Sequence, residues 1–140
     1  MVPGSTSVPF RQAITIDPNY AAAYSALSEA EWRADDMGVG DPASFERAAA
    51  AADRAIALAP DSPEGYWARG QLRNYYYFDW PGAQADYRKA LTLDPNFVPA
   101  LIQQGDLLAT LGHMSEGMAT TRKAVALDPM SVVAWRRLAH

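Results

Sequence analysis

Cysteine is absent from this 140-residue sequence, and the only lysines are Lys89 and Lys123. Without thiols the chain can form neither a disulfide framework nor a thiolate zinc site. The formal net charge is -4, so the chain lacks the basic surface that attracts nucleic-acid phosphates. We therefore expect no direct nucleic-acid binding. We also expect a cytoplasmic protein, although a chain without cysteine fits the periplasm as well.

Long apolar runs are missing too. The alanine-rich stretches are interrupted by charges and fall short of the ~20 residues that cross a bilayer, and the N-terminus has no apolar signal core. We therefore expect no membrane partner. Residues 1–9, MVPGSTSVP, are small, polar and rich in proline, which is typical of a flexible lead-in or a cloning remnant. The hydrophobic content of 49% is enough for one domain with a real core.

Internal repetition is the strongest pattern in the sequence. Four segments align without gaps: FRQAITIDP (10–18), ADRAIALAP (52–60), YRKALTLDP (87–95) and TRKAVALDP (121–129). Each carries alanine and two aliphatic residues at helical spacing, and each ends in proline, which stops a helix. A second stretch with apolar residues three and four positions apart follows every proline. The sequence therefore consists of helical hairpins of about 34 residues, the repeat length of a helical array.

These hairpins resemble the tetratricopeptide repeat (TPR) family. Two copies carry the matching residues Tyr66, Gly70, Ala83, Tyr87, Ala90 and Pro95, and then Leu101, Gly105, Leu108, Gly117, Ala124 and Pro129. The earliest copy, with Tyr24, Leu27, Ala48, Ala55 and Pro60, departs at Ser28 and Glu31, and Arg69 and Gln104 replace a leucine in the later copies. The resemblance implies an all-α fold, an α–α superhelix of antiparallel hairpins with about seven to eight helices.

The repeat boundaries predict one domain over residues 10–140. It comprises a partial repeat (10–18), a repeat with a loop insertion at 35–42 (19–60), two further repeats (61–95 and 96–129) and a partial repeat (130–140). The partial repeats would leave helix faces half covered, which predicts an excised piece of a larger protein and a homo-oligomer formed through its terminal helices. The string FDWPGAQADYRKALTLDPN is similar to repeats at the tails of bacterial winged-helix transcriptional regulators, cyclases and signalling kinases.

A groove is expected along the first helices of the hairpins, because these helices line the concave side of such a superhelix. The helical pattern places ten candidate ligand-binding residues on this stripe: Glu29, Trp32, Arg33, Trp67, Gln71, Asn74, Tyr75, Ile102, Asp106 and Arg136. Rings mixed with acids and arginines suit an extended peptide or a partner helix. The alternative is that Trp32 and Trp67 only cover the neighbouring hairpin.

Five aromatic residues crowd into positions 75–80, in the string YYYFDW. Counting back from Pro95 places Phe78–Trp80 at a hairpin corner, with Asp79 capping a helix that begins at Trp80. Relative to the 34-residue unit this copy has one extra residue at the corner. We expect the rings at this corner to seal the hairpin as part of the core, and a ligand platform is the alternative. Tyr75 is the exception, because its position belongs to the groove stripe.

The sequence contains no catalytic or metal-binding pattern. The two histidines, His113 and His140, have no ligand spacing, and the segment ADDMGVGDPASFE has Met37 and Val39 where a calcium loop needs oxygen ligands. We therefore expect no enzyme, no cofactor and no metal. The favoured function is a protein-interaction scaffold in a bacterial regulatory or signalling protein. The alternatives are a structural or oligomerisation spacer, and a small-molecule sensor near Tyr75–Trp80.

Overall fold

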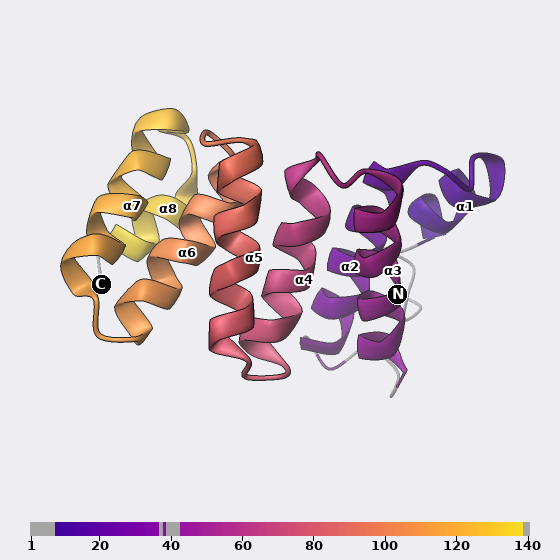
Figure 1. Cartoon of the computed structure of the whole chain (residues 1–140), viewed down its shortest axis with the longest axis horizontal. Coiled ribbons are helices and arrows are strands. Elements are labelled where there is room, and N and C mark those ends of the chain that lie inside the picture. The colour runs from indigo at the N-terminus through magenta and orange to yellow at the C-terminus, as the bar shows by residue number, and fades with distance from the viewer. Residues whose placement is uncertain (1–7, 37, 39–42, 139–140) are drawn as a thin grey trace.

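The computed structural model describes residues 8–36, 38 and 43–138, and within these ranges the chain contains eight helices and no strand. The helices are α1 (Val8–Ile16), α2 (Ala21–Asp36), α3 (Ser44–Leu58), α4 (Pro63–Tyr75), α5 (Trp80–Leu93), α6 (Val98–Thr110), α7 (Met114–Leu127) and α8 (Val132–Leu138). Figure 1 shows them as a row of antiparallel helices that runs from α1 at one end to α7 and α8 at the other. The predicted all-α architecture is confirmed.

Two of the predicted boundaries can be compared with the helices. Helix α1 begins at Val8, two residues before the predicted start of the first partial repeat. Helix α2 continues to Asp36, into the predicted insertion at 35–42. Residues 1–7 of the expected lead-in, residue 37 and residues 39–42 of the insertion lie outside the described ranges.

The Asp-Pro pairs end helices in two ways. Proline offers no backbone N–H and cannot continue the helix. The preceding aspartate carboxylate accepts a hydrogen bond from the backbone N–H two residues further on, which closes a compact turn. This turn recurs three times, at Asp17 with Asn19 (3.1 Å), at Asp94 with Asn96 (3.0 Å) and at Asp128 with Met130 (3.2 Å). These turns lead directly to α2, α6 and α8.

The start of α5 agrees with the sequence prediction. Its first residue is Trp80, Pro81 lies in the first turn, and the Asp79 carboxylate accepts a hydrogen bond from the Gly82 N–H at 3.0 Å. Such a cap pairs a backbone donor that has no partner inside the helix. The predicted cap is therefore confirmed.

Glycine lets the two helices of a hairpin approach closely. A Cβ added to Gly70 of α4 would lie 2.6 Å from the ring of the fully buried Tyr87 of α5. A Cβ on Gly117 of α7 would lie 2.7 Å from the carbonyl oxygen of Gly105 on α6. Both distances are shorter than a van der Waals contact, so no larger residue fits without movement. Glycine is therefore required at these crossings by space.

Ser28, a departure from the TPR pattern, occupies the equivalent position in the first hairpin. It is 1% exposed, and its hydroxyl donates a hydrogen bond of 2.7 Å to the carbonyl oxygen of Ala48 on α3. In this hairpin a serine, whose small side chain bonds the facing backbone, thus takes the place of the glycine found in the other hairpins. The crossing stays close in all three hairpins.

The two rows of helices differ in their spacing. Helices α2, α4, α6 and α8 contact one another in succession, whereas the described parts of α1, α3, α5 and α7 contact only helices of the other row. A stack whose one row is more closely spaced must curve toward that row. We call α2, α4, α6 and α8 the inner helices, and their free surface is the concave face of the solenoid.

The glycine crossing predicts a contrast between two substitutions at the same repeat position. Gly70→Ala should lower the free energy of unfolding by about 1–3 kcal/mol, because the added methyl group meets the buried Tyr87 ring. Ser28→Ala should cost about 1 kcal/mol, the value of one hydrogen bond. Urea denaturation followed by circular dichroism measures both. If Gly70→Ala were more stable than the natural chain, helix propensity and not space would decide this position.

Candidate docking groove

All ten predicted groove residues lie on inner helices. Glu29, Trp32 and Arg33 belong to α2, Trp67, Gln71, Asn74 and Tyr75 to α4, Ile102 and Asp106 to α6, and Arg136 to α8. Their exposure divides them. Gln71, Asn74 and Ile102 are buried at 4–7% exposure, and Arg33 and Arg136 are exposed, while the other five are partly exposed. These three buried residues offer little surface to a ligand.

Tyr75 links three inner helices at the centre of this face. Its ring lies against Trp32 of α2, with the ring centroids 5.6 Å apart and the planes tilted by 48°. Its hydroxyl lies 2.7 Å from Gln103 Oε1 and 3.1 Å from Asp106 Oδ2, both on α6, and its proton can be donated to either oxygen. The Trp32–Tyr75 pair is therefore a partly exposed aromatic surface whose orientation is fixed from both sides.

Trp67 contributes to packing more than to the surface. It lies against the buried cluster of Ala48, Ala52, Ala68 and Leu72, and also against the cluster that contains Tyr87. Its ring meets Phe97 edge to face, with a centroid distance of 6.1 Å. For Trp67 the structure thus favours the alternative in which the ring covers the neighbouring hairpin.

Charged side chains lie along the same face. Glu29 and Arg33 form an ion pair across one turn of α2. Such a pair is worth little in stability but keeps both charges at the edge of the groove. Asp106 and the exposed Arg136 carry charge toward the α8 end. The aromatic centre is therefore bordered by charges of both signs.

The structure also contains buried ionic contacts that the sequence reading missed. Glu31 of α2 is 1% exposed and is bonded by Arg11 of α1 and by Arg47 of α3, the latter at 2.9 Å. Burial by itself raises the pKa of Glu31, but the hydrogen bonds from Arg47 and Arg11 outweigh it, so that its pKa lies below the ordinary value. Helix α1 has no buried residue, and the ion pair of Arg11 with this carboxylate joins it to α2.

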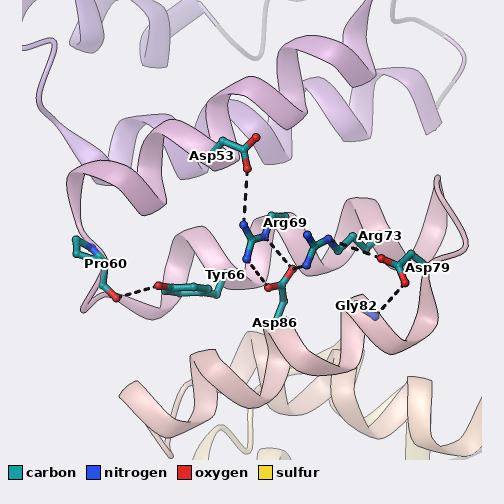
Figure 2. Close-up of polar contacts among 8 residues, drawn as sticks. All are labelled: Asp53, Pro60, Tyr66, Arg69, Arg73, Asp79, Gly82 and Asp86. Atoms are coloured by element: carbon teal, nitrogen blue, oxygen red, sulfur yellow. Dashed lines mark hydrogen bonds and ion pairs between the residues drawn. The ribbon is translucent and has the colours of Figure 1, made fainter.

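A second buried carboxylate, Asp86 of α5, joins the helices of the next hairpin (Figure 2). It is 3% exposed and accepts hydrogen bonds from Arg69 at 3.1 and 2.8 Å and from Arg73 at 3.0 Å, both on α4. The bond to Asp86 raises the pKa of Arg69 above its ordinary value. Glu31 and Arg69 are departures from the TPR pattern, and each proves to have an ionic partner.

The aromatic corner contradicts the prediction that its rings belong to the core. Four of the five rings are exposed: Tyr76 (44%), Tyr77 (52%), Phe78 (68%) and Trp80 (40%). At this corner Phe78 takes a positive φ of 53° that non-glycine residues rarely adopt. Tyr76 finds a partner in Phe45 of α3, with stacked rings 3.6 Å apart, but its outer surface stays open.

Two further features concern the described residues, 8–36, 38 and 43–138. No helix in these ranges is long and apolar enough to cross a membrane. Nor do the described histidine, aspartate and glutamate side chains gather in a group of three that could hold a metal ion.

Comparison with known proteins shows the fold. No protein-family model matches the chain, and no curated protein matches it in sequence. Among solved structures, a thermophilic TPR protein from Thermus thermophilus, TTC0263, is 21% identical, with a TM-score of 0.77 over 95% of this chain and 69% of that one. The Arabidopsis OM64 TPR domain is 19% identical, with a TM-score of 0.67 over 85% and 91% of the two chains.

MamA is a third similar structure, 17% identical, with a TM-score of 0.64 over 92% of this chain and 70% of that one. The chain therefore has a TPR-type solenoid fold, as the residues of the repeats predict. None of these three structures is described as a regulator, a cyclase or a kinase, so that second resemblance stays a prediction.

The Glu31 pair predicts how stability depends on pH. Because folding lowers the pKa of Glu31, its contribution is present near neutral pH and is lost as the pH falls below the ordinary value of 4.5. Glu31→Gln should cost about 1–3 kcal/mol at pH 7 and flatten the acid limb of the stability curve. Urea denaturation between pH 3 and pH 7 gives both quantities.

Glu29→Gln, on the same helix, is the matched control for this experiment. Glu29 is partly exposed and pairs with the exposed Arg33, so its loss should change the free energy of unfolding by less than about 1 kcal/mol. Equal costs for the two variants would show that the buried position of Glu31 has no special role.

Proposed function

We propose that this chain is a protein-interaction scaffold that binds an extended peptide or a partner helix along α2, α4 and α6. The observation that carries the proposal is the Trp32–Tyr75 pair, which is partly exposed and held by contacts to three inner helices. Aromatic anchors that are already fixed lose little conformational entropy when a partner binds. Such anchors at the centre of an interface commonly supply most of its binding energy.

The polar groups around the pair favour binding over catalysis. Tyr75 is bonded to Gln103 and Asp106, and Glu29 is paired with Arg33, so these groups already use part of their hydrogen-bonding capacity on one another. A general base needs a carboxylate or imidazole directed at a substrate proton. Groups of this kind instead form the polar edge that gives a docked segment its direction and register.

A regulatory setting is part of this proposal. The support for it is the similarity of residues 78–96 to repeats at the tails of bacterial regulators and signalling enzymes. In such a protein, the groove would recruit a partner to the attached domain. The surface that such recruitment would use is the inner face with the Trp32–Tyr75 pair.

Substitution of Trp32 tests the groove. A peptide selected from a random phage-displayed library on the immobilised chain, and then synthesised, should bind Trp32→Leu at least about tenfold more weakly, because an aliphatic side chain keeps the packing but removes the aromatic surface. Isothermal titration calorimetry gives the affinity, and circular dichroism verifies the fold. Met118→Ala, which removes an exposed apolar side chain from α7, is the control and should leave the affinity unchanged. Equal binding by Trp32→Leu and the natural chain would reject the groove.

A second candidate function, an oligomerisation module, is favoured by the ends of the row. Ile16 at the end of α1 is 86% exposed, and Met130, Val133 and Trp135 at the α8 end are 86%, 42% and 52% exposed. In stacked repeats, such faces are covered by the next hairpin. A second copy of the chain could cover them by placing its α1 end on α8.

Self-association through α8 has a direct test. The chain should dimerise as its concentration rises, and Trp135→Asp should keep it monomeric, because a charge cannot enter an apolar contact without a large cost. Sedimentation velocity over a range of concentrations measures this. Trp80→Asp, at an exposed ring far along the row, should still dimerise. A natural chain that stays monomeric at millimolar concentration would reject the module.

A further inference from the structure

An open pocket of about 400 Å³ lies on the side of α4 that faces away from the groove. Its lining residues are Ala49 and Asp53 of α3, Arg69, Leu72 and Arg73 of α4, and Tyr77 and Asp79 of the aromatic corner. Helices α3 and α5, which are described in full, do not contact each other, so α4 is exposed between them as the floor. The volume lies within the range of natural ligand sites.

The floor of the pocket is a fixed pair of guanidinium groups. Arg69 and Arg73 both bond the buried Asp86 behind them, as Figure 2 shows. Their other nitrogens lie near two further carboxylates but outside hydrogen-bonding distance. Arg69 Nη1 lies 3.9 Å from Asp53 Oδ1, and Arg73 Nε lies 3.9 Å from Asp79 Oδ2. These distances are too long for hydrogen bonds, so the rim carboxylates keep acceptor capacity for another group.

The charges of the site do not cancel. Three carboxylates, Asp53, Asp79 and Asp86, face two arginines, which leaves one net negative charge. The excess lies at the opening, because the side chains of Asp53 and Asp79 are 68% and 50% exposed whereas that of Asp86 is 4% exposed. An anion that approached Arg69 and Arg73 would first meet these two carboxylates. The pocket therefore favours a cation.

An aromatic wall stands beside the carboxylates. Tyr77 lines the pocket and meets Tyr76 at a centroid distance of 4.8 Å, and Tyr76 in turn stacks on Phe45 of α3. The two tyrosine rings are thus supported by Phe45 on one side and are exposed on the other. Phe78 and Trp80, which flank Asp79 in the sequence, add two more exposed rings to the same corner. Exposed rings in such number on one corner are typical of an interaction site.

We propose that this pocket binds an arginine side chain of a polypeptide partner, with an apolar neighbour of that arginine on the rings of Phe78 and Trp80. A guanidinium group donates paired hydrogen bonds to carboxylates and stacks on aromatic rings. Asp53, Asp79 and Tyr77 supply these three contacts around one pocket. The exposed rings extend beyond the pocket, which favours a polypeptide over a small guanidine. This site is separate from the groove and does not depend on it.

The test uses the blocked peptide acetyl-Gly-Phe-Arg-Phe-Gly-amide titrated into the isotope-labelled chain and followed by two-dimensional NMR. The amide signals of Tyr77 and Asp79 should shift in a saturable way. The same peptide with citrulline in place of arginine has nearly the same shape without the charge, and it should bind roughly tenfold more weakly. Free argininamide should also bind more weakly than the peptide, because it lacks the apolar neighbours.

Substitutions in the chain separate the pocket from other sites. The double variant Asp53→Asn with Asp79→Asn should bind the arginine peptide roughly tenfold more weakly, because it loses both rim charges. Asparagine at position 79 can still cap α5. Asp61→Asn with Asp17→Asn changes the net charge equally at exposed positions outside the pocket and should bind normally. Trp32→Leu should also bind normally, which keeps this result independent of the groove.

Four results would overturn the proposal. They are equal binding of the arginine and citrulline peptides, unchanged affinity in the rim double variant, no signal shift up to millimolar peptide, and binding of free argininamide as tight as that of the peptide. Tighter binding of a glutamate peptide would also contradict it and would assign the pocket to an anion held by Arg69 and Arg73.

Discussion

Close approach of the two helices within each hairpin is the constraint on which the rest of the structure depends. At Gly70 and Gly117 an added Cβ would lie within 2.7 Å of an atom of the facing helix, and at Ser28 a hydroxyl bonds the facing backbone directly. These crossings fix how each hairpin closes. They thereby fix which side of α2, α4 and α6 faces the groove, and which side of α4 forms the floor of the outer pocket.

Buried ionic contacts join neighbouring helices whose apolar side chains are mostly small. The hairpin interfaces are built mainly from alanine, which buries little area per residue. Glu31 joins α1, α2 and α3, and Asp86 joins α4 to α5. Each carboxylate is held by two arginines, and both of its oxygens accept hydrogen bonds. Asp86 also orients the guanidinium groups of Arg69 and Arg73 that line the outer pocket. The same carboxylate therefore holds the hairpin together and positions charged groups on its surface.

Much of the fold could be predicted from sequence because the signals are local. Asp-Pro pairs mark helix ends within a few residues, and the cap at Asp79 follows from its distance to Pro81. The ionic partners could not be predicted in this way, since Glu31 and Arg47 are 16 residues apart and their pairing requires the hairpin register. The aromatic corner was predicted wrongly, because a cluster of rings in the sequence does not show whether the side chains face the core or the solvent. Gln71 and Asn74 lie on the predicted face, but their burial depends on neighbours from other helices.

The solenoid presents two surfaces of different chemistry, the inner face with the Trp32–Tyr75 pair and an outer corner rich in exposed rings and carboxylates. The central claim is that the concave face of the inner helices receives a partner segment. The most direct measurement is a crystal structure of the chain with a peptide selected for binding. The account predicts that the peptide crosses α2, α4 and α6 with a side chain against the Trp32–Tyr75 pair. A peptide bound only to α1, α3, α5 or α7, with the inner face empty, would contradict it.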